Sequence, residues 1–193
     1  MTYLVVGLVL FLGLHSVRIF ADGWRSRVLQ ARGEGMYKGA YSLLSLLGLG
    51  LIIYGFGVAR ETPVLLWSPP VAMRHGGSLL VLFSFIFLVA AYVPRNAIKA
   101  RVHHPMVLGV KTWALAHVLM TGRVETAVLF GAFLLWAVLD FVSLRKRDRA
   151  QGAGSGTPEV SMAATVLTVA VGVGAYALFA VVLHGMLIGI RPF

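Results

Sequence analysis

The chain contains six long apolar stretches in which charged residues are scarce. The six stretches run over Tyr3–Phe20, Gly39–Ala59, Gly76–Pro94, Pro105–Gly122, Thr126–Leu144 and Val160–Ile190. A helix needs about 20 mainly apolar residues to cross the hydrocarbon core of a bilayer. Backbone polar groups find no water there, so a spanning segment of this length has to be helical. The sequence therefore predicts an all-α, polytopic membrane helix bundle of about six transmembrane helices.

Composition supports this class and excludes several others. Only 12% of the residues are charged and 59% are hydrophobic, whereas soluble domains carry roughly 25% charged residues. The chain has no cysteine, which excludes disulfides, thiolate catalysis and iron–sulfur clusters. Any bound metal must therefore depend on histidine, methionine or carboxylate side chains.

The basic residues are distributed very unevenly between the predicted connections. Thirteen of the 17 lysines and arginines fall in the first, third and fifth connections. Cytoplasmic loops of membrane proteins carry an excess of Lys and Arg, so we expect these connections inside and both termini outside. The net charge of +10 is then explained by topology and interfacial lipid, without nucleic-acid binding.

Residues 1–193 are predicted to form a single integral-membrane domain. The fifth connection includes residues 148–159, which read DRAQGAGSGTPE. A Gly/Ser-rich stretch of this kind has no apolar side chains to bury. We therefore expect a flexible cytoplasmic loop there.

Histidines inside predicted spans are the main candidates for chemistry, because ionisable groups in a membrane are costly and usually functional. His15 lies three residues before Arg18, and His117 lies six residues after Lys111, which is about 9 Å along a helix. We expect both imidazoles at one depth in the cytoplasmic half, as bis-imidazole ligation of a haem requires. The alternative for each is a core histidine hydrogen-bonded to a neighbouring backbone carbonyl.

Three further residues complete this predicted site. Arg18 and Lys111 are placed to receive haem propionates, although both also fit simple snorkelling towards the interface. Trp113 lies four residues before His117, hence on the same helix face, where it lines a cofactor or packs. His104, at a predicted helix start, and His184, in the opposite leaflet, are given no role in the site.

The sequence resembles the NnrU family of bacterial membrane proteins over nearly its whole length. The resemblance lies in GLHSVR, KGAYSLLSLLGLGLIIYGFG, AAYVPRNAIKARVHHPMVLGVKTWALAHVL and LHGMLIGIRP. The family takes its name from denitrification gene clusters. The resemblance implies a multi-pass protein of the bacterial inner membrane with a redox or nitric-oxide-related role and a redox or denitrification partner protein.

The family is similar to the plastid 15-cis-zeta-carotene isomerases, which are membrane haem-b proteins. Their two ligand motifs match His15-Ser16 and the segment from Trp113 to His117 in this sequence. The resemblance therefore implies haem b with His15 and His117 as axial ligands. An alternative cysteine ligand of the isomerases corresponds to Ala114, so ligand-switch isomerisation is not expected.

Other functions stay open at this point. RVHHPMVLG resembles a segment of the isoprenylcysteine methyltransferases, which implies a membrane transferase, but the tyrosine of that motif is replaced here. A cofactor-free assembly scaffold for a reductase is the non-enzymatic alternative. An absorption spectrum separates these classes, because only the haem protein has a Soret band.

The topology is open to a direct test. We expect alkaline phosphatase fused after Phe193 to be active and a fusion within the fifth connection to be inactive, because the enzyme folds only outside the cytoplasm. A cytoplasmic reporter that is active after Phe193 would contradict the predicted orientation.

Overall fold

The computed structural model describes residues 1–152, 159–190 and 192, and the ordered elements within them are helical. The helices in chain order are α1 (Thr2–Phe20), α2 (Asp22–Arg32), α3 (Glu34–Ala59), α4 (Val71–Tyr92), α5 (Ala97–Val102), α6 (Pro105–Met120), α7 (Val124–Ala150), α8 (Met162–Leu178), the π-helical turn η1 (Phe179–Leu183) and α9 (His184–Ile188). The all-α, polytopic membrane architecture predicted from the sequence is confirmed.

In the part of the chain that the structure describes, five helical segments are long and apolar enough to cross a bilayer. They are α1, α3, α4, α7 and the continuous segment Met162–Ile188. The fourth predicted span is shorter than expected, because α6 has 16 residues, or about 24 Å. Pro105 begins α6, and the extended backbone of Thr121 ends it.

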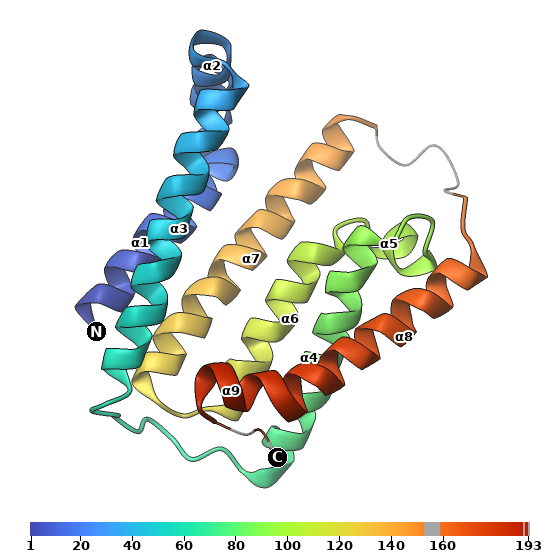
Figure 1. The fold of residues 1–193 in the computed structure, drawn as a ribbon. Helices are drawn as coiled ribbons and strands as arrows, with labels where there is room; N and C mark the ends of the chain where they lie inside the picture. The colour runs from blue at the N-terminus through green and yellow to red at the C-terminus, as the bar shows by residue number, and fades with distance from the viewer. Residues whose placement is uncertain (153–158, 191, 193) are drawn as a thin grey trace.

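The long helices follow a simple order of neighbours across the bundle. α3 packs on α1, α1 on α7, α7 on α6, α6 on α4, and α4 on α8. Figure 1 shows α7 between the α1–α3 pair and the group formed by α4, α6 and α8. α7 is thus the element through which the two halves of the bundle meet.

Close approach of α1 and α3 depends on glycine. A Cβ at Gly7 would lie 2.6 Å from the backbone nitrogen of Ile52, and a Cβ at Gly55 would collide with the backbone of Leu4. Small residues let membrane helices approach until their backbones touch, which maximises van der Waals contact where lipid provides no hydrophobic driving force. The two glycines therefore set the spacing of this helix pair.

The buried core lies where α1, α3 and α7 meet. Its fully enclosed members are Leu4, Leu8, Leu12, Ile52, Leu129 and Phe130, and the side chains of Phe11, Trp113, Phe133 and Trp136 pack against them. The outer surface is also apolar, as the 69% exposure of Val9 and the 63% exposure of Leu135 illustrate. Such a surface suits lipid contact, because lipid tails are as apolar as these side chains.

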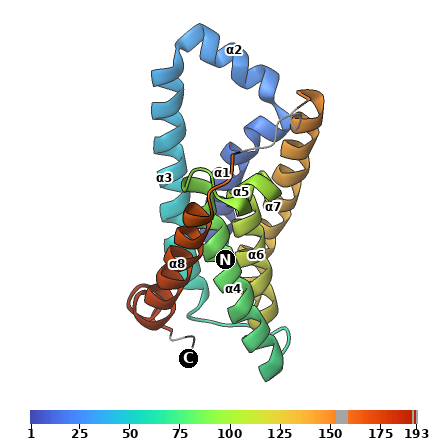
Figure 2. The same cartoon turned by 90° about the vertical axis from the view of Figure 1, so that its right-hand side faces the viewer.

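Short hydrogen bonds tie the helix ends together at both ends of the bundle. We call the end that carries α2, α5 and the last turn of α7 the basic end, and the other the opposite end (Figure 2). At the basic end, the Ser161 amide donates to the Arg95 carbonyl at 2.8 Å. At the opposite end, the Leu66 amide donates to the Gly122 carbonyl at 2.6 Å, and the Arg60 guanidinium donates to the Ile188 carbonyl at 2.9 Å.

One prediction about the C-terminal half needs correction. Residues 148–150 are the last turn of α7 rather than loop, because the helix continues through its basic final turns; residues 153–158 of the predicted flexible loop lie outside the described residues. The last span changes to the π-helical turn η1 at Phe179–Leu183. Gly172 serves packing, since a Cβ there would lie 2.8 Å from the Cα of Ile86.

The glycine contacts predict opposite effects for similar substitutions on α3. Gly55→Ala should destabilise the bundle by about 1–3 kcal/mol, because its Cβ meets the backbone of α1. Gly50→Ala, which has open space around it, should stabilise α3 by up to about 1 kcal/mol through reduced backbone entropy. Thermal unfolding of both variants in detergent measures the difference, and a Gly55→Ala protein as stable as Gly50→Ala would refute the packing.

Candidate functional site

His15 is held in one orientation by its own helix. Its Nδ1 lies 2.7 Å from the carbonyl oxygen of Phe11, one turn earlier on α1. A carbonyl can only accept a hydrogen bond, so Nδ1 is the protonated nitrogen and Nε2 of the neutral ring carries the lone pair. The ring stacks on Phe11 at a centroid distance of 4.2 Å, with Tyr41 at 5.3 Å and Trp136 at 6.0 Å.

His117 repeats the same arrangement on α6. Its Nδ1 lies 2.9 Å from the carbonyl oxygen of Trp113, again one turn earlier. Its ring stacks on Phe130 of α7 at 4.3 Å and lies 5.3 Å from the Trp113 ring. Both histidines are thus hydrogen-bonded to a neighbouring carbonyl, as the alternative interpretation of the sequence proposed, and both keep Nε2 unbonded in the same tautomer.

A continuous series of aromatic rings connects the two histidines. Phe133 of α7 is its centre, with ring centroids 6.0 Å from Phe11 and 5.6 Å from Trp113. The order is therefore His15, Phe11, Phe133, Trp113 and His117. The imidazoles approach α7 from two sides, one from α1 and one from α6, with aromatic packing between them.

The two imidazoles lie at different levels of α7, which corrects the predicted shared depth. His15 packs against Trp136 and His117 against Phe130, six residues apart, which corresponds to about 9 Å along the helix axis. The prediction took Lys111 as a marker of the interface. The Lys111 ammonium instead lies 4.8 Å from the centre of the Phe141 ring, within the bundle. His117 consequently belongs to the half of the bundle towards the opposite end.

The cationic residues of the predicted site lie towards the basic end. Arg18 follows His15 in the last turn of α1, and its carbonyl accepts a hydrogen bond of 3.3 Å from Arg147. Lys111 lies two residues before Trp113 on α6 and contacts Phe141 of α7. Trp113 shares the face of His117, as the spacing of four residues predicts, and its ring packs 4.9 Å from Phe130.

His104 has a partner that the sequence did not indicate. Its Nε2 lies 2.8 Å from Oδ2 of Asp148, and both side chains are about four-fifths buried, with 19% and 24% exposed. This contact joins the start of α6 to the last turn of α7. It escaped prediction because Asp148 was assigned to a flexible loop.

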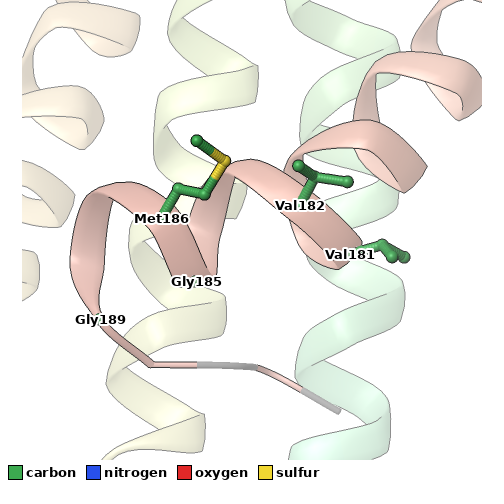
Figure 3. A pocket seen from close by; sticks show the side chains of 5 residues that line it. All are labelled: Val181, Val182, Gly185, Met186 and Gly189. Carbon is green, nitrogen blue, oxygen red and sulfur yellow. The ribbon is translucent and has the colours of Figure 1, made fainter.

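His184 lies at the opposite end, directly after η1. Its Nδ1 is 2.6 Å from the carbonyl oxygen of Ile190, and its ring meets Phe179 edge-on at 5.9 Å. π-Helical turns inside helices occur frequently at functional sites. A cavity of about 330 Å³ lies beside this turn, but glycine and exposed aliphatic side chains such as Met186 line it (Figure 3).

Three buried side-chain atoms have no hydrogen-bond partner among the described residues, and none of them was singled out from the sequence. The Glu125 side chain at the start of α7 is only 1% exposed, and its Oε1 has no hydrogen-bond partner among the described residues. The buried Oγ of Ser45 and the buried Nε1 of Trp136 also have no hydrogen-bond partner there. Glu125 was predicted to lie in the fourth connection, because the predicted spans end at Gly122 and begin at Thr126.

The helix order and lipid-exposed apolar surface define a multi-pass helical membrane protein with histidines in its interior. The family model described as NnrU protein matches residues 3–192. The chain therefore belongs to the NnrU family. No curated protein and no solved structure matches it.

Proposed function

We propose that this NnrU-family chain is a haem-b-binding protein of the bacterial inner membrane, with His15 and His117 as its iron ligands. The observation that carries the proposal is the shared state of the two imidazoles. Each donates its Nδ1 hydrogen to the carbonyl one turn earlier, at 2.7 Å for His15 and 2.9 Å for His117. Metal-ligating histidines typically bond their second ring nitrogen in this way, which fixes the tautomer and the ring orientation.

The residues around His15 and His117 have the chemistry that a haem requires. The aromatic rings between the two histidines limit how both could bind one iron. Imidazole donors suit iron, and Phe11, Phe133 and Trp113 provide the apolar, water-poor environment that controls a haem's reactivity. These same rings lie between the two histidines. A single haem held by both ligands would therefore have to take the place of this packing.

Haem held by these residues would supply one-electron transfer or nitric oxide binding. The chain's own residues provide the environment. Arg18, in the last turn of α1, and Lys111, within the bundle on the side of His117 that faces the basic end, would suit the propionates, because charge-assisted hydrogen bonds are about twice as strong as neutral ones. The helix carbonyls of Phe11 and Trp113 hold the imidazoles in the ligating tautomer. A redox or nitric-oxide-related role in denitrification, with a partner protein, is the function we assign to this arrangement.

The isomerase alternative receives no support from the residue at position 114. Ala114 is fully buried on α6 and offers no sulfur to replace a histidine ligand. The methyltransferase alternative depends on the segment RVHHPMVLG, and the Nε2 of His104 in this segment already contacts Oδ2 of Asp148. The cofactor-free scaffold remains as an outcome of the experiment below.

Absorption spectra of the detergent-purified protein and its variants test the proposal. We expect a low-spin haem-b spectrum in the natural protein and its loss in both His15→Ala and His117→Ala. His75→Ala, which alters an exposed histidine of α4, is the matched control and should leave the spectrum unchanged. Haem content by pyridine haemochrome, measured against protein, gives the occupancy.

Three results would contradict the proposal in different ways. Full low-spin haem in the His15→Ala, His117→Ala double variant would exclude both residues as ligands. About half of the haem retained in each single variant would show that the histidines serve separate sites. A natural protein that carries no haem and takes up none on reconstitution would favour the scaffold.

A further inference from the structure

A second cavity lies at the basic end, away from the histidines of the candidate site. Its volume is about 410 Å³, and its lining residues are Arg95, Asn96, Lys99, Ala100, His103 and Glu159. We propose that this cavity binds the phosphate-bearing headgroup of an anionic membrane lipid. The proposal is independent of haem binding.

The floor of the cavity is rigidly built. The Asn96 side chain is 1% exposed, donates to the carbonyls of Ala90 at 3.0 Å and Val93 at 2.6 Å, and accepts from the Lys99 amide at 2.7 Å. The Ala97 amide donates to Oγ1 of Thr165 at 2.9 Å. These bonds fasten α5 to the end of α4 and to the start of α8, so the cavity is a fixed part of the bundle.

The backbone is strained at both edges of α5. Arg95 and His103 have φ angles of 55° and 63°, in the left-handed region that residues other than glycine rarely occupy. Both residues line the cavity. Strained residues of this kind concentrate at ligand-binding sites, where the surrounding structure holds them in place.

The charges of the cavity favour an anion. Arg95 and Lys99 are cationic, His103 adds an imidazole, and Glu159 is the single carboxylate in the lining. Arg95 and Glu159 lie 3.4 Å apart and both are largely exposed, at 62% and 81%, whereas charge-assisted N–H···O bonds measure about 2.7–2.9 Å. Among the described residues, the Lys99 ammonium donates to one acceptor, the neutral carbonyl of Ala91, at 2.9 Å. Arg95 and Lys99 can therefore both donate hydrogen bonds to the oxygens of a phosphate group.

The position of the cavity indicates a lipid as the source of the phosphate. Its lining residues follow α4 and precede α8: Tyr92 ends α4 three residues before Arg95, and Met162 begins α8 three residues after Glu159, with exposures of 76% and 77%. An aromatic ring at a span end typically marks the headgroup level. A headgroup in the cavity therefore leaves its acyl chains beside apolar side chains, and basic pockets between helices on the cytoplasmic side bind anionic lipids in this way.

Native mass spectrometry of the full chain with phosphatidylglycerol, and with phosphatidylcholine as the neutral lipid, tests the proposal. We expect the Arg95→Gln, Lys99→Gln variant to bind phosphatidylglycerol about 100-fold more weakly, since each direct hydrogen bond to a charged group contributes roughly tenfold or more. The control is Arg27→Gln, Arg32→Gln, which removes the same charge from exposed positions of α2 and should change binding less than about twofold. Glu159→Gln should strengthen binding, because it removes the competing carboxylate.

The proposal fails if both double variants weaken binding equally, since diffuse surface charge then accounts for the effect. Equal affinity for phosphatidylcholine, or weaker binding by Glu159→Gln, would also overturn it. A third arm adds inorganic phosphate. Displacement of phosphatidylglycerol by millimolar phosphate would show that the cavity takes free phosphate and would overturn the lipid assignment.

Discussion

An apolar membrane interior makes a buried polar group without a partner costly, so most polar groups there bond within the protein. For the backbone this constraint makes each spanning segment a helix. The same constraint acts on side chains: Ser16, Thr112 and Thr168 donate to the carbonyl one turn earlier, at 2.6–2.7 Å. His15 and His117 do the same through Nδ1. The ligating tautomer of the candidate site is thus a consequence of placing histidine on a helix in lipid.

Apolar runs with few charges were enough to predict the membrane architecture, because helix formation in a bilayer depends on local composition. The exact ends of the helices depended on backbone conformation and on contacts between helices, which the apolar pattern does not show. α6 is shorter than its apolar run, since Thr121 turns the backbone into an extended conformation. α2 and α5 were assigned to loops, because helices at the basic end carry many charges and gain their order from neighbouring helices. The π-helical turn η1 has no glycine or proline within it, so the sequence offered no signal for it.

The candidate site was predictable only where its contacts are local. The pairing of Trp113 with His117 follows from a spacing of four residues, and the structure confirms it. The relative depth of His15 and His117 depends instead on how far α1 and α6 slide along α7. The prediction of a shared depth was wrong because it placed Lys111 at the interface, whereas Lys111 packs on the aromatic ring of Phe141. The bond between His104 and Asp148 likewise joins residues 44 positions apart.

Cysteine cross-linking tests most directly whether the two histidines lie at separate levels on either side of α7. The natural chain has no cysteine, so introduced pairs react without background. A short bifunctional methanethiosulfonate reagent should join a Phe11→Cys, Phe133→Cys pair, whose natural rings are 6.0 Å apart. It should leave a His15→Cys, His117→Cys pair unjoined, because this variant lacks both proposed iron ligands and therefore reports the haem-free bundle, in which the two positions pack against Trp136 and Phe130. Equal cross-linking of both pairs would contradict the account, because it would place both histidines at one depth.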